Sequence, residues 1–457
     1  MNLAEYQELE TFLLQYPDTT MLELMAPDLN GILRGKRIPA SEFATLYRQG
    51  VKHPAALTLL NSIGDMIEDV PGYEGDPDKL MRAIAGTLAP VPWLNSDTGQ
   101  VLATFTELDG APGLFDTRNI LVNALGPVWS MGLSVVVAVE MEFYLVEEGE
   151  GRLPTPHLPR LPGTSLPQEG VQYAMAEDLW DQDAFLEDVR ETCLLQGVPM
   201  TTVHSEFSPG QYEINLRHCA DPLLACDHAL MLKRIVKGVA RKHGMYATFM
   251  AKPFDGLAGS GMHMHVSLYD ESGENVFADG NTNTAPAISE TLRHAVGGMA
   301  LTMQAATAVF APNANSYRRM VPGSFVPLAP TWGYNHRDVA LRIPVSDHKD
   351  TRIEHRVAGA DANPYLVLAA IIAGMHYGIT ERCEPPEMIN EGETLEPVFT
   401  LPRLWQQALD QFADSEVLAR YLTPEFCELF KSIRQTECDR FAAQVSNRDY
   451  EWYLRSV

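Results

Sequence analysis

The pattern of apolar and polar residues along the chain predicts several strands in its first third. Residues 21–25 and 32–38 are β-prone runs separated by the turn signal of residues 28–31, and this arrangement predicts a hairpin. Residues 101–108 predict another strand. Residues 134–146 predict a longer strand, which is apolar on both faces in its first half, as a buried strand should be, and alternates in its second half.

Two later helices have clear start signals. The pairs Asp221-Pro222 and Asn363-Pro364 each supply an N-cap residue followed by a proline at the first helical position. We expect the first helix to end at residues 243–244 and the second to end at Gly378, because glycine commonly follows the last helical turn.

The remaining segments give weaker organisational signals. Residues 151–170 contain five prolines, so we expect no regular element there. This stretch is either a linker between domains or a loop of one domain. Residues 401–412 and roughly the last 35 residues predict further helices.

Composition narrows the class of protein. The chain has 457 residues, of which 46% are hydrophobic, so it is a folded protein with room for two or three domains. Its 60 acidic and 34 basic residues give a net charge of −26, which argues against binding to nucleic acid or to anionic membranes. The six cysteines form no CxxC pair, no basic-apolar leader begins the chain, and the longest apolar run is residues 366–373. We expect a cytoplasmic protein with reduced thiols.

Four predicted strands carry polar side chains on one face and apolar side chains on the other. The polar groups that share a face are Glu140 with Glu142; Gln211, Glu213 and Asn215; His263, His265 and Ser267; and Arg352, Glu354 and Arg356. For any single strand, a solvated face is the simpler interpretation. Taken together, and with Glu206 added, the four faces predict one cavity whose carboxylates are held together by cations. Oxygen ligands with one imidazole favour Mg²⁺ or Mn²⁺ over zinc.

Arginines are concentrated in one later part of this acidic chain. Arg318, Arg319, Arg337, Arg342, Arg352 and Arg356 fall within residues 318–356. Arginine binds carboxylate and phosphate groups through a bidentate fork, although pairing with surface acids is the simpler interpretation for Arg318. Clustered carboxylates and arginines together predict phosphoryl transfer, and the absence of a GxxxxGK[ST] sequence excludes a P-loop.

The motifs in this order resemble the glutamine synthetase family over nearly the whole chain. The segments that carry the resemblance are residues 139–143, 206–213, 252–253, 259–265, 315–323, 341–344, 352–354 and 362–365. The resemblance implies an α+β fold, with a small β-grasp-like N-terminal domain at residues 1–115. The larger catalytic domain, residues 116–457, would have a curved, mainly antiparallel sheet flanked by helices. The family also assembles as homo-oligomeric rings, here a dodecamer, with active sites between adjacent subunits.

The resemblance also implies a role for each matching position. One metal would be held by Glu142, Glu206 and Glu213, and the second by Glu140, His263 and Glu354. Glutamate would be held by Gly259, Arg319 and Arg356, with Arg337 facing the transferred phosphate, and these three arginines are the catalytic candidates. ATP would contact His265, Ser267, Arg342 and Lys349. The expected cofactors are ATP and two or three Mg²⁺ or Mn²⁺ ions per active site.

In this chemistry, ATP phosphorylates the γ-carboxylate of glutamate, and an amine then attacks the γ-glutamyl phosphate. The amine position departs from the family pattern, because Phe325 stands where glutamine synthetases carry the glutamate that binds ammonium. A phenyl ring gives an alkylamine an apolar wall, and Phe325, Trp332 and Tyr334 could all pack on carbon or make cation–π contacts. The simpler interpretation is that these three aromatic residues belong to the core. Residues 61–65 also lack the family's ammonium-site sequence.

These departures make the chain resemble the γ-glutamylpolyamine (γ-glutamylputrescine) synthetase branch. The shared segments are residues 29–39, 258–261, 332–333, 339–342 and 356–362. We therefore predict a ligase that joins glutamate to putrescine or another polyamine in amine catabolism, with Asp65, Glu68 or Asp69 as candidates for deprotonating the amine. The alternatives are a ligase for short alkyl, ethanolamine-like or aromatic amines, an ordinary ammonia-using glutamine synthetase, and a catalytically silent scaffold or regulator.

Overall fold

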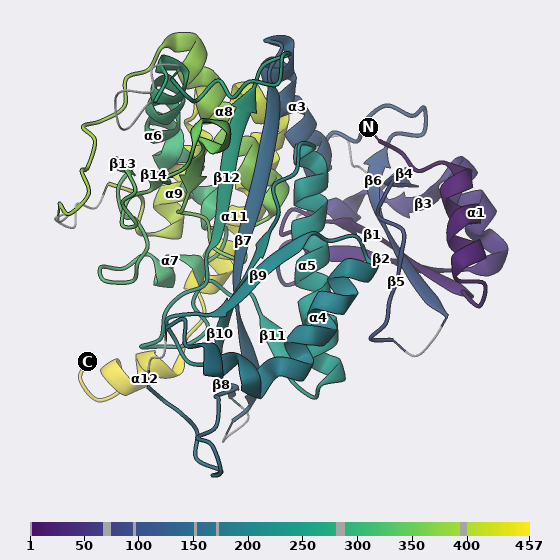
Figure 1. Cartoon of the computed structure of the whole chain (residues 1–457), viewed down its shortest axis with the longest axis horizontal. Coiled ribbons are helices and arrows are strands. Elements are labelled where there is room, and N and C mark those ends of the chain that lie inside the picture. Colours follow the sequence, from purple (N-terminus) through teal and green to yellow (C-terminus); the bar gives the residue numbers. More distant parts are fainter. Residues whose placement is uncertain are drawn as a thin grey trace.

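The computed structural model describes residues 2–66, 75–94, 97–149, 153–170, 173–279, 288–393 and 400–457. The described chain forms two sheets, one near the N-terminus and one in the larger remainder (Figure 1). This is the α+β arrangement predicted from the sequence. No helix in the described ranges combines the length and apolar character needed to cross a bilayer.

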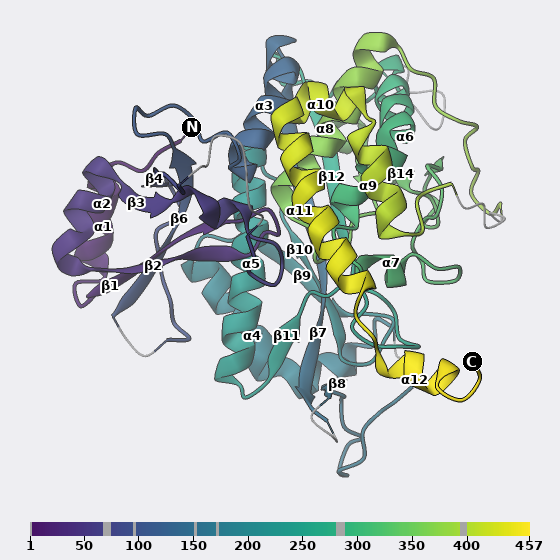
Figure 2. The ribbon, with the colours of Figure 1, turned by 180° about the vertical axis from the view of Figure 1, so that it is seen from behind.

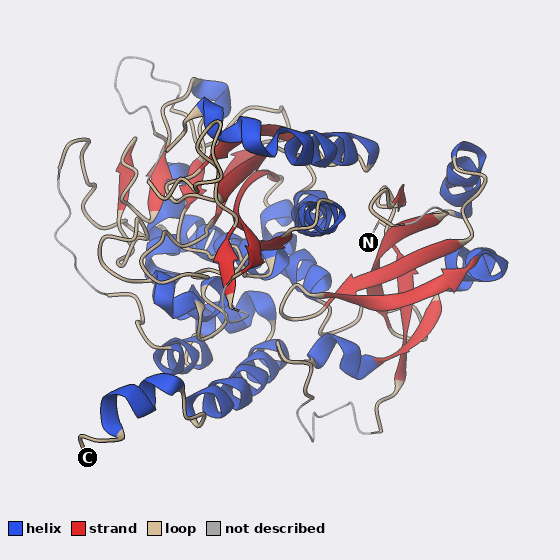
Figure 3. Ribbon diagram, turned by 90° about the horizontal axis from the view of Figure 1, so that it is seen from below, coloured by secondary structure: helices blue, strands red, loops and turns tan. Residues whose placement is uncertain are grey.

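The N-terminal sheet has the strand order β2-β1-β6-β4-β3, with β5 paired to β6. Its strands are β1 (Met21–Pro27), β2 (Leu33–Pro39), β3 (Val51–Pro54), β4 (Asp78–Ala83), β5 (Ala89–Pro90) and β6 (Thr98–Thr106). Helices α1 (Tyr6–Gln15) and α2 (Phe43–Gln49) pack beside it, on the outer side of the molecule in Figure 3. The antiparallel pairing of β1 with β2 confirms the predicted hairpin, and β6 confirms the strand predicted at residues 101–108, displaced by a few residues. This part of the chain is β-grasp-like.

The larger sheet has the order β13-β14-β15-β12-β7-β10-β9 and is antiparallel except between β13 and β14. Its strands are β7 (Ser134–Glu148), β8 (Pro154–Pro156), β9 (Met200–Ser205), β10 (Gln211–Leu216), β11 (Tyr246–Thr248), β12 (Met262–Tyr269), β13 (Trp332–Tyr334), β14 (Leu341–Ile343) and β15 (Ile353–His355). Both β8 and β11 pair with β7 outside the main order.

Helices cover one face of this sheet. They are α3 (Thr117–Ser130), α4 (Asp183–Leu195), α5 (Pro222–Lys242), α6 (Glu290–Phe310), α7 (Ser316–Arg319), α8 (Pro364–Glu381), α9 (Trp405–Ala413), α10 (Glu416–Leu422) and α11 (Pro424–Ala442). The last helix, α12 (Asn447–Tyr453), has no buried residue and lies away from the sheet. Figure 2 shows α3, α8, α9, α10 and α11 in front of β7 and β12. One hydrophobic core joins these helices to alternate residues of β7, so the opposite face of the strand is left for polar groups.

The turn of the N-terminal hairpin is fixed to the larger part of the chain. Asn363, which caps α8, donates from Nδ2 to the carbonyl oxygen of Asp28 at 3.0 Å. Arg434 donates from Nη1 to the Oδ1 of Asn30 at 2.5 Å and from Nη2 to the carbonyl oxygen of Leu29 at 3.4 Å. A domain boundary at residues 115/116, between β6 and α3, stays a prediction.

Four local expectations need correction. Pro154–Pro156 forms the short strand β8 inside the proline-rich stretch, because an edge strand tolerates residues without an N–H donor. In the first half of β7 only one face is buried, since Val136 and Ala138 are partly exposed. The helix α8 continues past Gly378 to Glu381, and the missing side chain of Gly378 serves the close contact between α8 and Gly298 of α6 rather than a helix end. Finally, α9 begins at Trp405 rather than at residue 401.

Candidate active site

A cavity of about 750 Å³ opens on the polar face of the larger sheet. Strand alternation places Glu140 and Glu142 of β7 on this face, while Met141 and Phe143 between and beyond them are buried in the core. Glu213 of β10 also lines the cavity. The polar faces that the sequence singled out on separate strands therefore converge.

The strand register explains why the polar groups meet. Glu213 on β10 lies opposite Glu142 on β7, and Glu140 on β7 lies opposite His263 on β12. One step farther across the sheet, His265 lies opposite Glu354 on β15. Directly opposed side chains on neighbouring strands are close enough to interact, so the register builds a polar ladder across four strands.

Three groups in this cavity have ligand atoms that all lie within 4.8 Å of one another. They are Glu140, His263 and Glu354; Glu142, Glu213 and His263; and His204, Glu206 and Glu213. The first group is the set expected for the second metal. The set expected for the first metal is divided between the other two groups.

His204 also belongs to the cavity, although the sequence did not single it out. Its Nε2 lies 2.9 Å from the Oε1 of Glu206 and 3.8 Å from the Oε1 of Glu213. The hydrogen bond to Glu206 is the main cause of a raised His204 pKa. The signal was its position two residues before Glu206 on an extended segment, which places both side chains on one face.

The carboxylates repel one another strongly. Burial raises the pKa of Glu213 to about 10, and the charges of Glu140 and Glu142 add to the shift. Burial likewise raises the pKa of Glu142. Burial also opposes ionisation of Glu140, but hydrogen bonds with His263 at 3.3 Å and His265 at 2.9 Å outweigh it and lower the pKa of Glu140. Because a divalent cation relieves such repulsion, this oxygen-rich set with one imidazole fits Mg²⁺ or Mn²⁺.

Glu354 is held between two arginines. Arg342 donates from Nη1 to its Oε2 at 2.7 Å, and Arg356 pairs with its Oε1. Burial would raise the pKa of Glu354, but the charge of Arg356 lowers it to about 2. The carboxylate of Glu354 is thus charged over the physiological pH range and stays available to a cation.

The backbone around residues 259–261 is packed tightly against the cavity. The amide of Gly261 donates to the Oε2 of Glu142 at 2.8 Å, and Gln211 donates from Nε2 to the carbonyl oxygen of Gly259 at 3.0 Å. Arg319 is buried, packs its stem on Gly259 and donates from Nη1 to the carbonyl oxygen of Val357 at 2.8 Å. Its Nε is buried without a hydrogen-bond partner among the described residues, which suits a site for an anionic ligand.

The remaining arginines take different positions. Arg337 is exposed and lines the cavity, and Arg352 donates from Nε to the Nδ1 of His265 at 3.2 Å. Arg318 is exposed with its guanidinium over the ring of Phe441 at 5.9 Å, so it belongs to the surface, as the simpler interpretation held. Asn335 and Tyr173 also line the cavity, and the sequence gave no signal for either.

Two phenyl rings form an aromatic edge of the cavity. Phe325 is 58% exposed and contacts Phe207 edge-on, with ring centroids 4.9 Å apart. Phe207 was missed in the sequence, although it directly follows Glu206. The other two predicted aromatics do not line this cavity. Trp332 is buried and donates from Nε1 to the carbonyl oxygen of Pro386 at 2.7 Å, and Tyr334 packs on the core.

Five expected residues lie away from the cavity wall or outside the described part of the chain. Ser267 is buried and donates to the carbonyl oxygen of Thr351 at 3.0 Å, and Lys349 is exposed in a short 3-10 helix, so neither lines the cavity. Asp65 pairs with Arg440 and does not line it either. Glu68 and Asp69 fall outside the described residues.

The family model, the similar proteins and the similar solved structure found by comparison agree with one another. Residues 114–453 match the family model described as glutamine synthetase, catalytic domain. Gamma-glutamylputrescine synthetase of Escherichia coli (strain K12) is 40% identical over 457 residues, covering 99% of this chain and 95% of that protein. Glutamate–isopropylamine ligase of a Pseudomonas species is 31% identical, with 95% and 94% covered. The solved structure of apo GmaS without ligand superimposes with a TM-score of 0.83 at 25% identity, covering 98% of this chain and 99% of that one.

Proposed function

Because the chain belongs to the glutamine synthetase family and is a ligase of that family, we propose that it joins the γ-carboxyl group of glutamate to putrescine or another polyamine. The observation that carries the amine assignment is Phe325, an exposed phenyl ring at the cavity. The family resemblance implies a carboxylate at this position in ammonia-using enzymes. The relatives named gamma-glutamylputrescine synthetase and glutamate–isopropylamine ligase support an organic amine as the acceptor.

The side chains of the cavity divide into groups with separate tasks. Divalent cations, which this family uses with ATP, would be held by the three carboxylate-imidazole groups, so two or three ions fit, and when bound they neutralise phosphate charge. Arg319 and Arg356, with the backbone at Gly259, would bind the carboxylates of glutamate. Arg337 would offset negative charge on the transferred phosphoryl group. Of the four residues expected to contact ATP, Arg342 and His265 line the cavity and would bind the nucleotide. Ser267 and Lys349 do not line it.

The aromatic edge determines which nitrogen can attack the γ-glutamyl phosphate. An ammonium ion is small and needs several hydrogen-bond acceptors to replace its water shell, whereas the methylene chain of an alkylamine loses water favourably against a ring. Phe325 and Phe207 offer such a surface. A primary amine bound there in its neutral form would attack the acyl phosphate.

The direct test measures phosphate release with glutamate, ATP and Mg²⁺ and a panel of acceptors. Putrescine, spermidine, isopropylamine, ethanolamine and ammonia cover the rival substrates. We expect the highest kcat/KM with putrescine or spermidine. A higher value with isopropylamine or ethanolamine would move the assignment to short amines, and a higher value with ammonia would refute the claim of an organic acceptor.

A variant at the aromatic edge tests the physical reason. Phe325→Glu restores a carboxylate beside the acceptor and is expected to raise the ammonia-to-putrescine ratio of kcat/KM by about tenfold, the scale of one charge-assisted hydrogen bond. Phe441→Glu is the matched control, because that ring is 51% exposed and lies outside the cavity. Equal ratios in the two variants would contradict a role for Phe325 in amine selection.

A further inference from the structure

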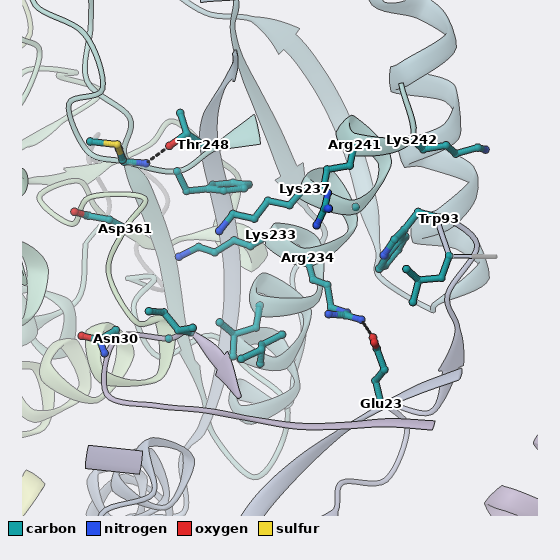
Figure 4. Close-up of a pocket in the computed structure, with 18 of the residues that line it drawn as sticks. Glu23, Asn30, Trp93, Lys233, Arg234, Lys237, Arg241, Lys242, Thr248 and Asp361 are labelled. Carbon is teal, nitrogen blue, oxygen red and sulfur yellow. Dashed lines mark hydrogen bonds and ion pairs between the residues drawn. The ribbon is translucent and has the colours of Figure 1, made fainter. Parts of the chain in front are cut away.

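A second cavity lies where the N-terminal sheet meets α5 (Figure 4). Its volume is about 920 Å³, and none of its lining residues belongs to the catalytic cavity. One wall comes from β1, β2 and the turn between them, the opposite wall comes from α5, and residues 248–250 close one end. The cavity therefore spans the two parts of the chain.

The walls of this cavity are strongly basic in a chain of net charge −26. The basic residues that line it are Arg37, Lys233, Arg234, Lys237, Arg241 and Lys242, against the acids Glu23 and Asp361. Because residues four apart share a helix face, Lys233, Lys237 and Arg241 lie in one row along α5. In Figure 4 the amino groups of Lys233 and Lys237 extend in the same direction, away from Trp93.

Some of these charges are already neutralised within the protein. Arg234 pairs with Glu23, and Arg37 donates from Nε to the same carboxylate at 3.0 Å. Lys242 donates to the Oδ2 of Asp188 at 2.8 Å.

The three cations in the row along α5 are not neutralised by any described residue in this way. Among the described residues, Lys233, Lys237 and Arg241 have no ion pair with a carboxylate. They are the charges that remain available to a ligand, and together they carry up to three positive charges along one face of α5.

The environment of Lys233 shows how unfavourable this grouping is without an anion. Its Nζ donates to the carbonyl oxygen of Ala362 at 3.0 Å, and burial lowers the pKa of Lys233 to about 7, with a further contribution from Lys237. Both ammonium groups lie over the ring of Phe249, at 5.9 and 5.6 Å. A bound anion would relieve the repulsion between these lysines.

At the other end of the cavity, Trp93 and Leu94 form an apolar wall beside Arg234. Trp93 packs closely over Gly238 of α5, where a side chain would collide with the indole ring, and Leu94 lies beside it in the lining. The guanidinium of Arg234 lies 5.4 Å from the centroid of the Trp93 ring. An organic group could contact this wall while its phosphates reach the lysine row.

We propose that the cavity between the N-terminal sheet and α5 binds a small phosphorylated metabolite about the size of a nucleotide. Its phosphate groups would lie against Lys233, Lys237 and Arg241, and its organic part against Trp93 and Leu94. The volume suits this class, because cavities for such ligands measure about 300–1,000 Å³. A ligand there would contact both parts of the chain and stabilise their contact.

Calorimetric titration of the assembled enzyme with ADP and with inorganic pyrophosphate, both in EDTA, tests the proposal. EDTA removes the divalent cations that would hold phosphate groups in the catalytic cavity, and Arg337→Gln reports any binding of the probes that remains at the arginines there. Lys237→Gln/Arg241→Gln removes two exposed charges and is expected to weaken binding of both probes by about tenfold or more. Tighter binding of ADP than of pyrophosphate would show that the apolar wall is also used, and equal binding would show phosphate recognition alone; each supports the proposal.

A charge-matched control distinguishes site binding from general attraction. Lys36→Gln/Lys52→Gln removes two exposed lysines that do not line the cavity, and Lys36 points to the other face of β2 from Arg37. This control is expected to bind both probes within about twofold of the wild type. Retained wild-type kinetics of phosphate release would show that the two double variants are folded.

Four results would overturn the proposal. The first is no binding to the assembled enzyme, and the second is equal weakening in the two double variants. The third is weakening by Arg337→Gln but not by Lys237→Gln/Arg241→Gln, which would place the anion in the catalytic cavity. A change in oligomeric mass in Lys237→Gln/Arg241→Gln without any change in probe affinity would mean that the cavity receives a second copy of the chain, and it would count equally against the proposal.

Discussion

Replacing Gly259 by alanine tests the close packing at the floor of the catalytic cavity. A Cβ atom at this position would lie 2.6 Å from the carbonyl oxygen of Ala251 and 2.6 Å from the Cγ of Arg319. The first neighbour is backbone and cannot move freely. The backbone of Gly259 is not in the left-handed region, so the effect of Gly259→Ala would come from crowding alone.

The size of the effect follows from what has to move. Forcing one extra carbon into a packed site costs about 1–3 kcal/mol. The Nη1 of Arg319 is held by the carbonyl oxygen of Val357 at 2.8 Å, so relief of the clash displaces a guanidinium that we assign to glutamate binding. If that cost falls on substrate and transition-state binding, kcat/KM for glutamate decreases by about 5- to 150-fold.

The assay is steady-state phosphate release at saturating ATP and putrescine with glutamate varied. We expect the loss to appear mainly as a higher KM for glutamate, while the thermal midpoint stays close to that of the wild type. Gly126→Ala is the matched control, because no atom lies within 4 Å of a Cβ there and alanine favours the helix α3. Identical glutamate kinetics in Gly259→Ala and Gly126→Ala would refute the reasoning.

Three further outcomes are expected. EDTA should abolish phosphate release and Mg²⁺ should restore it, whereas release that persists in EDTA would contradict the metal assignment. Asp227→Asn should lower the free energy of unfolding by about 3–5 kcal/mol, because it leaves Arg118, paired at 3.1 Å and equally buried, without a counter-charge. Glu187→Gln, in an exposed pair, should cause no measurable change in urea unfolding, and similar losses in both variants would be inconsistent with the burial argument. Burial lowers the pKa of His376, whose Nδ1 lies 2.6 Å from the hydroxyl oxygen of Tyr421. As the pH falls, the imidazole is therefore protonated in the unfolded chain before it is protonated in the folded one. Stability should therefore decrease as the pH falls below about 6.5, and the decrease should be smaller in His376→Gln when urea unfolding is compared at pH 7.5 and 5.5; an unchanged slope would argue against this group.

The starts of the helices α5 and α8 could be predicted from the sequence, because they depend on residues close together in the chain. Asp221 and Asn363 accept backbone hydrogen bonds at the helix starts that the sequence indicated, because a cap needs only residues within the first turn. The predicted end of α8 at Gly378 was wrong for a reason that lies outside this helix. Its missing side chain serves the contact with Gly298, and no local pattern distinguishes that use from a helix end.

The candidate site likewise has some features that the sequence predicts and others that only the fold decides. Alternation along β7 is sufficient to place Glu140 and Glu142 on one face, and the motif order is sufficient to indicate the family. Neither predicted that Glu213 belongs to two carboxylate-imidazole groups, or that His204 takes part in one of them. Those groups depend on which strands pair and in which register.

The sequence alone determined the alternating faces, the capped helices, the family and the residues able to bind cations and anions, because each depends on neighbours in the chain or on ordered motifs. The tertiary structure alone decided that Phe207 meets Phe325 and that Trp332 is buried in the core. It also decided that the hairpin and α5 enclose a basic cavity. The physical reason is that these contacts join segments 54 or more residues apart, so strand register and helix packing fix them, and no local pattern in the chain encodes them.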